Sequence, residues 1–291
     1  MDVQNVEMQS SSPDVPVVGQ SVGGLEAPVP KARSRRRGNR RTWPFVGAYL
    51  PVTVLVVWQG VCSLQLVVPA ILPSPIQIAD AFIQLTRTGE LLADLKISLI
   101  RVILGFLLGA GLGLICGILA GMYRRFEEIV DPTVQMLRTI PHLAITPLFI
   151  LWLGLGEWSK DVLIATGAFF PMYINTFMGI RSVDAKLFDV ARVLQFSRLQ
   201  QVSKLVLPAA LPNLLLGLRL SIGVSWLGLV VAELLGSSSG VGYLILNAQQ
   251  FSQTDVVFVG LIVFAAVGKL SDSLVRVLEH RLLRWRDSYT G

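Results

Sequence analysis

A few ionisable residues lie within or beside otherwise apolar stretches, and these residues have the clearest capacity for chemistry. They are Arg138, His142, Arg219, Glu233 and Lys269. A charged side chain in a membrane span is costly, so it is a candidate for a translocation pathway. The three cations could form a basic vestibule that favours a departing anion, or they could reach the lipid headgroups with their long side chains.

The other two candidates carry different expectations. His142 follows a proline, and it could pack by hydrogen bonding or line a permeation path. Glu233 cannot pair with Arg219 on a shared helix, because a separation of fourteen residues rises about 21 Å. We expect Glu233 to form a gate, to anchor a loop or to serve a structural role.

The sequence gives little support to an enzymatic reaction. It contains no Gly-x4-Gly-Lys-Ser/Thr loop to cradle a phosphate. His142 and His280 belong to no metal-binding motif, and Cys62 and Cys116 form no Cys-x-x-Cys pair. We therefore expect no catalytic residue, no metal site, no cofactor and no ATPase site in this chain. A membrane-integral enzyme is the less favoured alternative.

Composition places these residues in a membrane protein. Of 291 residues, 53% are hydrophobic and 15% are charged, whereas soluble chains carry about 25% charged residues. A helix needs roughly 20 apolar residues to cross the hydrocarbon core. We expect an all-α polytopic protein with six spans, at about residues 44–63, 102–123, 134–153, 162–180, 212–235 and 254–275, with Pro141 and Pro147 interrupting the third. Residues 76–94 predict an amphipathic helix at the membrane interface.

Glycines recur at every fourth residue of the second predicted span. They are Gly105, Gly109, Gly113, Gly117 and Gly121, which lie along one face of a helix. Small residues let another backbone approach closely inside a membrane. We interpret this face as a packing surface for a neighbouring helix.

Clustered basic residues predict the orientation of the chain. Residues 1–30 carry no Lys or Arg and resemble a disordered tail, whereas residues 31–41 carry seven cations. Four segments on one predicted side hold 18 of the 25 Lys and Arg residues: 31–41, 122–131, 181–204 and 276–286. We expect both termini to be cytoplasmic, and residues 31–41 to contact lipid rather than nucleic acid. The predicted domains are a tail (1–41), a membrane domain (42–286) and a C-terminal tail (287–291).

A long amphipathic segment, residues 181–208, joins the fourth and fifth predicted spans. It predicts two short helices with a hinge near residues 195–197, and Ser197 is a suitable N-cap for the second. Apolar residues follow helical spacing in its first half: Leu187, Val190, Ala191 and Leu194. This face could dock in the groove of a partner or pack on the protein itself.

Residues 189–208 resemble the signature of a transporter family. The sequence DVARVLQFSRLQQVSKLVLP is similar to the pattern E-A-A-x-x-x-G-x(9)-I-x-L-P of the inner-membrane permease subunits of binding-protein-dependent ABC importers. The corresponding positions are Asp189, Val190, Ala191, Gln195, Leu205, Leu207 and Pro208. Stretches such as QMLRTIPHLAITPLFILWLGLGE and LRLSIGVSWLGLVVAELLGSSSGVG look like the aliphatic sulfonate, taurine and nitrate type.

The resemblance implies an architecture, a site and partners. It implies a type I, MetI-like permease in a prokaryotic inner membrane, with two copies forming the pore. An external solute-binding protein would deliver a small anionic solute, and a separate ATP-binding subunit would hold the coupling region, residues 184–206, in a cleft. The coupling residues would be Asp184 and Asp189 as polar groups, Leu187, Val190, Ala191, Leu194 and Leu205 as packing groups, Gln195 at the turn, and Leu207 and Pro208 at the end of the element.

Two positions depart from the signature. Asp189 keeps the charge of the usual Glu on a shorter side chain, and Gln195 replaces a glycine that would tolerate a positive φ. Gln reaches that conformation at a cost of about 1 kcal/mol or more. Either the turn is built differently here or coupling is altered.

The main alternative is an ion-coupled secondary transporter, which would favour ionisable residues at the membrane midplane. Within the favoured class, sulfonate, taurine, nitrate and thiamine-precursor permeases are too alike for this sequence to separate them.

Overall fold

The computed structural model describes residues 46–283, so the tails predicted at residues 1–41 and 287–291 lie outside the described part. Residue contacts divide the chain into Met1–Gly47 and Ala48–Gly291, and all the described helices lie in the second unit apart from the first two residues of α1. The described residues form helices joined by short turns, which confirms the all-α class. In chain order they are α1 (Val46–Ser63), α2 (Pro75–Arg87), α3 (Glu90–Met122), α4 (Arg124–Leu137), α5 (His142–Leu153), α6 (Glu157–Arg181), α7 (Ala185–Val193), α8 (Arg198–Gln201), the π-helical turn η1 (Val202–Val206), α9 (Leu207–Gly236), α10 (Val241–Gln250) and α11 (Thr254–Leu282).

Four helical segments among residues 46–283 are long and apolar enough to cross a membrane. They are α3, α6, the continuous helix Val202–Gly236 and α11. Two shorter apolar helices, Tyr49–Ser63 and Ala144–Leu153, occupy the positions of the first and third predicted spans. The class of helical membrane protein is therefore confirmed, with four full-length spans and two shorter apolar helices.

The third predicted span, residues 134–153, is not a single helix. α4 ends at Leu137, and α5 begins at His142 after a turn in which Pro141 is the N-cap residue. Proline has no N–H to donate and disfavours the helical conformation in the residue before it. α5 has 12 residues and rises about 18 Å, which is less than the roughly 30 Å of a hydrocarbon core.

The predicted interfacial helix at residues 76–94 is divided as well. α2 begins with a capping box, in which Ser74 and Gln77 exchange side-chain to backbone hydrogen bonds. It ends before Gly89, whose φ of 81° is a left-handed conformation that glycine adopts without a Cβ penalty. Residues 90–94 therefore belong to α3, which has 33 residues and rises about 50 Å.

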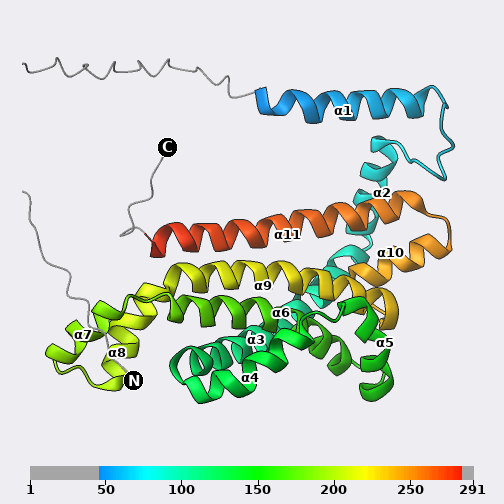
Figure 1. Ribbon diagram of the computed structural model, residues 1–291. Helices are drawn as coiled ribbons and strands as arrows, with labels where there is room; N and C mark the ends of the chain where they lie inside the picture. Colours follow the sequence, from blue (N-terminus) through cyan, green and yellow to red (C-terminus); the bar gives the residue numbers. More distant parts are fainter. Residues whose placement is uncertain (1–45, 284–291) are drawn as a thin grey trace, which may run out of the picture. The chain divides into compact units, whose positions relative to one another are not determined.

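α6 packs against both α3 and α9, and these three helices form the centre of the described fold (Figure 1). The predicted glycine face of α3 lies against α6: a Cβ on Gly113 would be 2.5 Å from the Phe169 carbonyl oxygen, and one on Gly117 would be 2.8 Å from that of Tyr173. On the other side of α6, the Ser221 hydroxyl donates to the Ala168 carbonyl at 2.8 Å. The prediction of a glycine packing surface is therefore confirmed.

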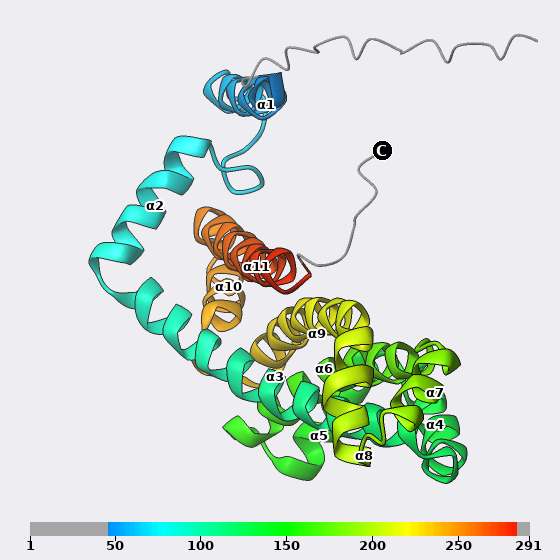
Figure 2. The same ribbon diagram turned by 90° about the vertical axis from the view of Figure 1, so that its left-hand side faces the viewer.

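A second hydrophobic cluster joins α2, α10 and α11. Its buried members are Ile78, Ala81 and Leu85 of α2, Val241 and Leu244 of α10, and Val259 and Val263 of α11, together with Leu91 at the start of α3. Trp58 of α1 packs against it, with its ring 5.5 Å from that of Phe258. Figure 1 shows α10 at one end of the α6–α9 pair and α7 and α8 at the opposite end, and Figure 2 views the pair from the end with α7 and α8.

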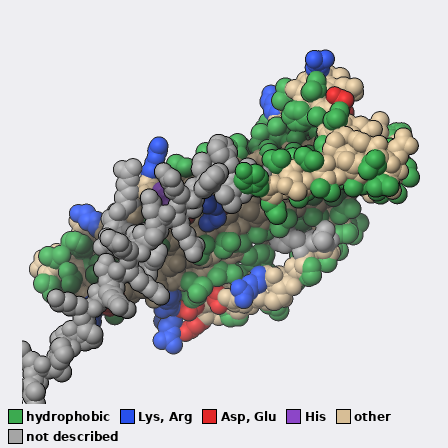
Figure 3. Space-filling model, turned by 90° about the horizontal axis from the view of Figure 1, so that it is seen from above, with side chains coloured by type: hydrophobic (Ala, Val, Ile, Leu, Met, Phe, Trp, Pro, Cys, Tyr) green, Lys and Arg blue, Asp and Glu red, His purple; other side chains and the backbone are tan. Residues whose placement is uncertain are grey.

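Large hydrophobic side chains remain exposed along the outer faces of these helices. Leu151 is 77% exposed and Leu227 is 67% exposed. On the face shown in Figure 3, hydrophobic side chains cover much of the described surface, and charged groups are few. Such a surface suits a lipid environment or a protein partner, since soluble monomers rarely expose large apolar patches.

Candidate functional site

The segment between α6 and α9 forms two short helices joined by a turn. Asp184 caps α7 by accepting a hydrogen bond from the Lys186 N–H at 2.9 Å. Ser197 and Gln200 exchange side-chain to backbone hydrogen bonds, so Ser197 is the N-cap that the sequence predicted for the second helix. These capping bonds fix where each short helix begins, and they hold the turn between them.

α7 presents an apolar face that the described chain leaves largely uncovered. Leu187, Val190 and Leu194 are 41%, 53% and 58% exposed, and Val193, which the sequence analysis did not select, is 82% exposed. Ala191 is buried, so it supports the packing of α7 on its own chain. The described part of the chain therefore does not cover these apolar side chains.

Gln195 occupies the conformation that the signature glycine would adopt. Its φ is 54°, in the left-handed region. The Gln195 N–H donates to the Arg192 carbonyl at 3.0 Å, and the Phe196 N–H donates to the Ala191 carbonyl at 2.9 Å. These two bonds form a Schellman motif, which usually has glycine at this position. The turn therefore has the left-handed geometry that glycine favours, with a non-glycine residue in it.

The remaining predicted coupling residues differ in exposure. Asp189 is exposed, and its carboxylate lies 3.5 Å from the Arg192 guanidinium. Leu205 packs against the α6–α9 core, whereas Leu207 and Pro208 are exposed.

Pro208 does not end the helical element, contrary to the expectation from the sequence. The helix continues from η1 into α9 without interruption, and the Leu207 N–H donates to the Val202 carbonyl across a π-type turn. Proline lacks an N–H, and its ring collides with the carbonyl four residues before it in a regular helix. The wider turn at Val202–Val206 directly precedes this proline, and π-type turns accommodate such irregularities within a helix.

The four predicted pathway residues stand in different settings. Arg219 of α9 donates to Asp272 of α11 at 2.6 Å, and Arg276 donates to the same carboxylate at 2.8 Å. Arg138 is exposed in the turn after α4. His142 is the first residue of α5, and its side chain lies outside the described part of the structure. Glu233 is buried and has partners of its own.

Glu233 belongs to a polar group that we call the Arg101 cluster: Ser98, Arg101, Glu157, Glu233 and Ser239. Ser98, Arg101 and Glu233 are buried, whereas Ser239 is half-buried and Glu157 is exposed. Arg101 is 3% exposed, and its guanidinium makes five hydrogen bonds, as many as its donors allow. It donates to Glu157 at 2.5 and 2.8 Å, to Glu233 at 2.8 Å, and to the carbonyl and hydroxyl of Ser239 at 2.7 and 3.1 Å. A buried carboxylate is tolerable when it is paired and hydrogen-bonded in this way.

The Arg101 cluster also holds the loop between α9 and α10. The Gly242 N–H donates to Glu233 at 2.8 Å, and the Val241 N–H donates to the Ser98 hydroxyl at 2.9 Å. The Gly240 N–H donates to Asp94 at 2.8 Å. Of the roles considered for Glu233, loop anchoring is therefore the one that the contacts favour.

Arg101, Glu157 and Ser98 were not among the site residues predicted from the sequence. Their charges and their predicted side of the membrane could have pointed to them. Arg101 precedes the second predicted span, Glu157 precedes the fourth and Glu233 lies at the end of the fifth. All three therefore lie at the same predicted membrane face. Opposite charges at one membrane face are candidates for pairing.

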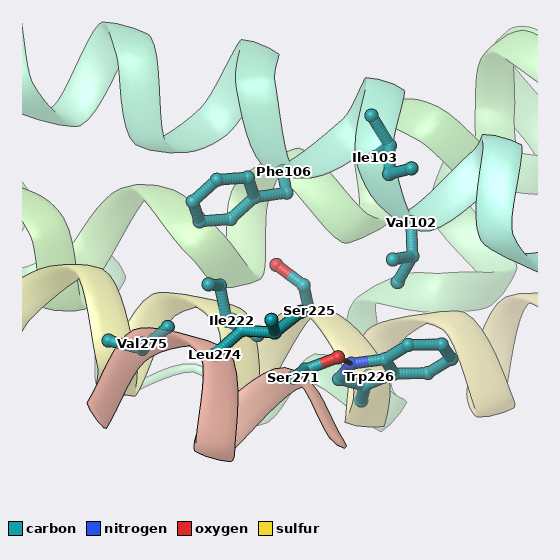
Figure 4. Close-up of a pocket in the computed structure, with 9 residues that line it drawn as sticks. All are labelled: Val102, Ile103, Phe106, Ile222, Ser225, Trp226, Ser271, Leu274 and Val275. Atoms are coloured by element: carbon teal, nitrogen blue, oxygen red, sulfur yellow. Dashed lines mark hydrogen bonds between the residues drawn. The ribbon is translucent and has the colours of Figure 1, made fainter. Parts of the chain in front are cut away.

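A crevice of about 170 Å³ lies between α3, α9 and α11 (Figure 4). Its polar donors are already used: the Trp226 indole donates to Ser271 at 3.2 Å, and the Ser225 hydroxyl donates to the Ser221 carbonyl at 2.8 Å. The remaining lining is apolar, from residues such as Val102, Phe106 and Ile222. The crevice therefore suits an apolar group better than a charged one.

The described residues contain no group of three or more His, Cys, Asp and Glu side chains that could hold a metal ion. The letters Gly236-Ser-Ser-Ser-Gly240 fit a Gly-x-Ser-x-Gly pattern, but this loop joins two helices, whereas a nucleophile elbow joins a strand to a helix.

Comparison with known proteins adds three relatives. Residues 109–284 match the family described as "Binding-protein-dependent transport system inner membrane component". The chain is 58% identical over 272 residues to the putative aliphatic sulfonates transport permease protein SsuC of Bacillus subtilis, covering 94% of this chain and 99% of that protein. It is 44% identical to the SsuC protein of Escherichia coli (83% and 92% covered). It is 35% identical to the Escherichia coli taurine transport system permease protein TauC (80% and 86% covered).

Proposed function

This chain belongs to the family of binding-protein-dependent transport system inner membrane components, and we propose that it forms half of the translocation pathway of an ATP-driven importer. It is an ABC importer permease of the sulfonate and taurine type. The observation that carries the proposal is the uncovered apolar face of α7 between two packed spans. In this scheme the face docks in a cleft of an ATP-binding subunit.

The way that α7 is connected supports a role in coupling. α7 follows α6 after a short turn, and it leads through α8 and η1 directly into α9. α6 and α9 pack closely: a Cβ on Gly217 would lie 2.8 Å from the Cβ of Asn175. A push on α7 therefore reaches two spans at once, as rigid-body switching between inward-facing and outward-facing states requires.

The proposed substrate is an aliphatic sulfonate, delivered by an external solute-binding protein. The support is that the chain is 58% identical to a protein named for aliphatic sulfonates and 35% identical to one named for taurine. The proposed assembly is a homodimer in a prokaryotic inner membrane. Both termini and α7 are proposed to be cytoplasmic, since the positive-inside rule places the basic segments there.

Co-purification with an ATPase subunit tests the coupling proposal. We would co-express the chain with candidate subunits and compare it with the variant Val190→Arg/Val193→Arg, which changes two exposed residues of α7. Ile129→Arg on α4 is the matched control, because Ile129 is also exposed and apolar, at 74%. We expect the native chain and the control to retain the subunit, and the α7 variant to lose it while keeping its own folded elution profile.

Transport measurements in vesicles distinguish the importer from the alternative. ATP-dependent uptake of an alkanesulfonate that requires the ATPase and the binding protein supports the proposal. Uptake driven by an ion gradient through the chain alone would overturn it and establish a secondary transporter.

A further inference from the structure

α3, α6 and α9 interlock so closely that they have little room to slide past one another. A Cβ on Gly105 would lie 2.6 Å from the Cβ of Ile164, and one on Gly179 would lie 2.9 Å from that of Asn213. Contacts this short leave no space for a methyl group, because packed interiors deform little. The three helices therefore behave as one block. One end of this block is joined to the α7 segment, and the other end is followed by the loop after α9.

The contact between α9 and α11 is of a different kind. No glycine of α9 or α11 has an atom of the other helix among the atoms nearest to the position where a Cβ would be. The helices meet through side chains instead, such as the rings of Trp226 and Phe264 at 6.4 Å and the Arg219–Asp272 pair. Relative motion is therefore easier at this contact than within the block.

The Arg101 cluster closes the block at the end opposite α7. Arg101 comes from α3, Glu157 from the start of α6 and Glu233 from the last turns of α9, so one guanidinium joins all three helices. The amide of Gly240 at the end of the loop and those of Val241 and Gly242 at the start of α10 donate to carboxylates and a hydroxyl of α3 and α9. Gly240 has a φ of 108°, and the Glu233 carboxylate and the Arg101 guanidinium occupy the space of a Cβ there.

The contacts of the Arg101 cluster to the loop are made mainly to the loop backbone, and part of the loop remains at the surface. Ser239 contributes its carbonyl and hydroxyl to Arg101, whereas Ser238 is exposed. The cluster therefore gives an exposed loop a fixed position relative to the block. In the proposed orientation this loop lies on the external side of the membrane.

We infer that Arg101 is a positioning residue for transport: it fixes the loop at residues 237–240 and the start of α10 to the α3–α6–α9 block, so that this loop and α7 move together. The inference rests on the proposed function. When the loaded binding protein contacts the outer loop, the block and α7 are displaced with it, and this displacement is passed to the ATPase. When the ATPase closes, it displaces α7, and the loop moves by the same route. The chain needs no separate signalling element between the two faces.

The first arm of the test uses this chain alone in lipid nanodiscs and measures amide hydrogen exchange. Ser98→Ala removes the acceptor of the Val241 N–H and a donor to Glu233, and Arg101→Lys keeps the charge but loses the planar fork. We expect exchange at residues 240–242 to accelerate about tenfold in both variants, as the loss of one hydrogen bond to a charged group implies. Arg124→Gln removes an exposed pair with Glu128 and is the control, with unchanged exchange.

The second arm uses the full complex and measures ATP hydrolysis with and without the substrate-loaded binding protein. A purely structural role would lower complex assembly and basal hydrolysis together. We expect Ser98→Ala and Arg101→Lys to keep assembly and basal hydrolysis but to lose most of the stimulation by the binding protein. Arg124→Gln should keep the stimulation.

The outcomes separate the inference from the proposed function. If the native complex shows stimulation and the folded variants retain it, the inference is overturned and the proposed function stands. If the native chain binds no ATPase, the proposed function fails, and the transmission role of Arg101 fails with it. If exchange at residues 240–242 is unchanged in both variants, the fixed loop is refuted whatever the second arm shows.

Discussion

Replacing Gly109 with alanine tests the packing on which the block depends. The added Cβ of Gly109→Ala would collide with the carbonyl group and Cα of Ala165. These are backbone atoms of α6, so no side chain can turn aside, and α3 must move away. Overpacking a tight contact costs about 1–3 kcal/mol, and we expect the upper end of that range because the obstacle is backbone.

The same helix supplies the matched control. Gly111, two residues further along α3, has no atom within 4 Å of the position of a Cβ. Gly111→Ala should therefore gain about 0.5–1 kcal/mol from the helix preference of alanine. Gly109→Ala gains the same helix preference, so the two alanine variants should differ by the packing cost alone, about 3 kcal/mol.

Unfolding of the purified protein in mixed micelles measures this difference. Titration with sodium dodecyl sulfate, followed by tryptophan fluorescence, gives a midpoint for each variant. We expect the midpoint of Gly109→Ala to fall and that of Gly111→Ala to rise slightly. Equal shifts for the two variants would refute the close approach of α3 and α6.

The same titration checks three further expectations. Gln195→Gly should remove about 1 kcal/mol of strain at the turn after α7, although the greater entropy of glycine in the unfolded chain offsets part of this gain. Gln195→Val should destabilise the protein. Identical midpoints for the two variants would contradict the positive φ of residue 195. Gly240→Ala should cost about 3 kcal/mol from strain and the clash with Glu233, while Gly236→Ala, with its nearest side-chain atom at 3.4 Å, should cost little. Arg219→Gln should leave the midpoint unchanged because Asp272 keeps Arg276 as a partner; a large fall would show that α9 and α11 depend on this pair.

Features set by local spacing were predictable from the sequence. The glycine face of α3 follows from a repeat of four in an apolar run, and the structure places it against α6. The short helices near α7 follow from amphipathic spacing and from the capping preference of Ser197. Each of these features involves residues within a few turns of one another, so the chain itself carries the information.

The positions at which helices end or are interrupted were harder to predict, because they depend on single residues. Gly89 ends the helix that was expected to continue to residue 94, and Pro141 divides the third predicted span. Both residues were visible in the sequence, but each can also occur inside a helix when its surroundings compensate. Pro208 shows the opposite outcome, since a π-type turn precedes it and the helix continues.

The Arg101 cluster depends on contacts between distant parts of the chain. Arg101 and Glu233 are 132 positions apart, and Arg101 and Glu157 are 56 apart. No periodicity within one helix predicts such a pair, because pairing depends on which helices are neighbours. The prediction that Arg219 and Glu233 are too far apart on one helix to pair was correct. It did not identify the residue with which Glu233 pairs. A comparison of charges at one membrane face would have narrowed the choice to a few residues.

The departures of α7 from the family signature concern surface chemistry more than shape. Gln195 keeps the positive φ and both Schellman hydrogen bonds, so the turn has the geometry that a glycine would give. The side chains of Gln195 and Asp189 are both exposed, where a docked subunit would meet them. A shorter acid and an added amide change the polar contacts on that face, but they leave its apolar residues in place. We therefore expect these two positions to affect which ATPase subunit binds, and the buried Ala191 and the turn to fix how the segment is held.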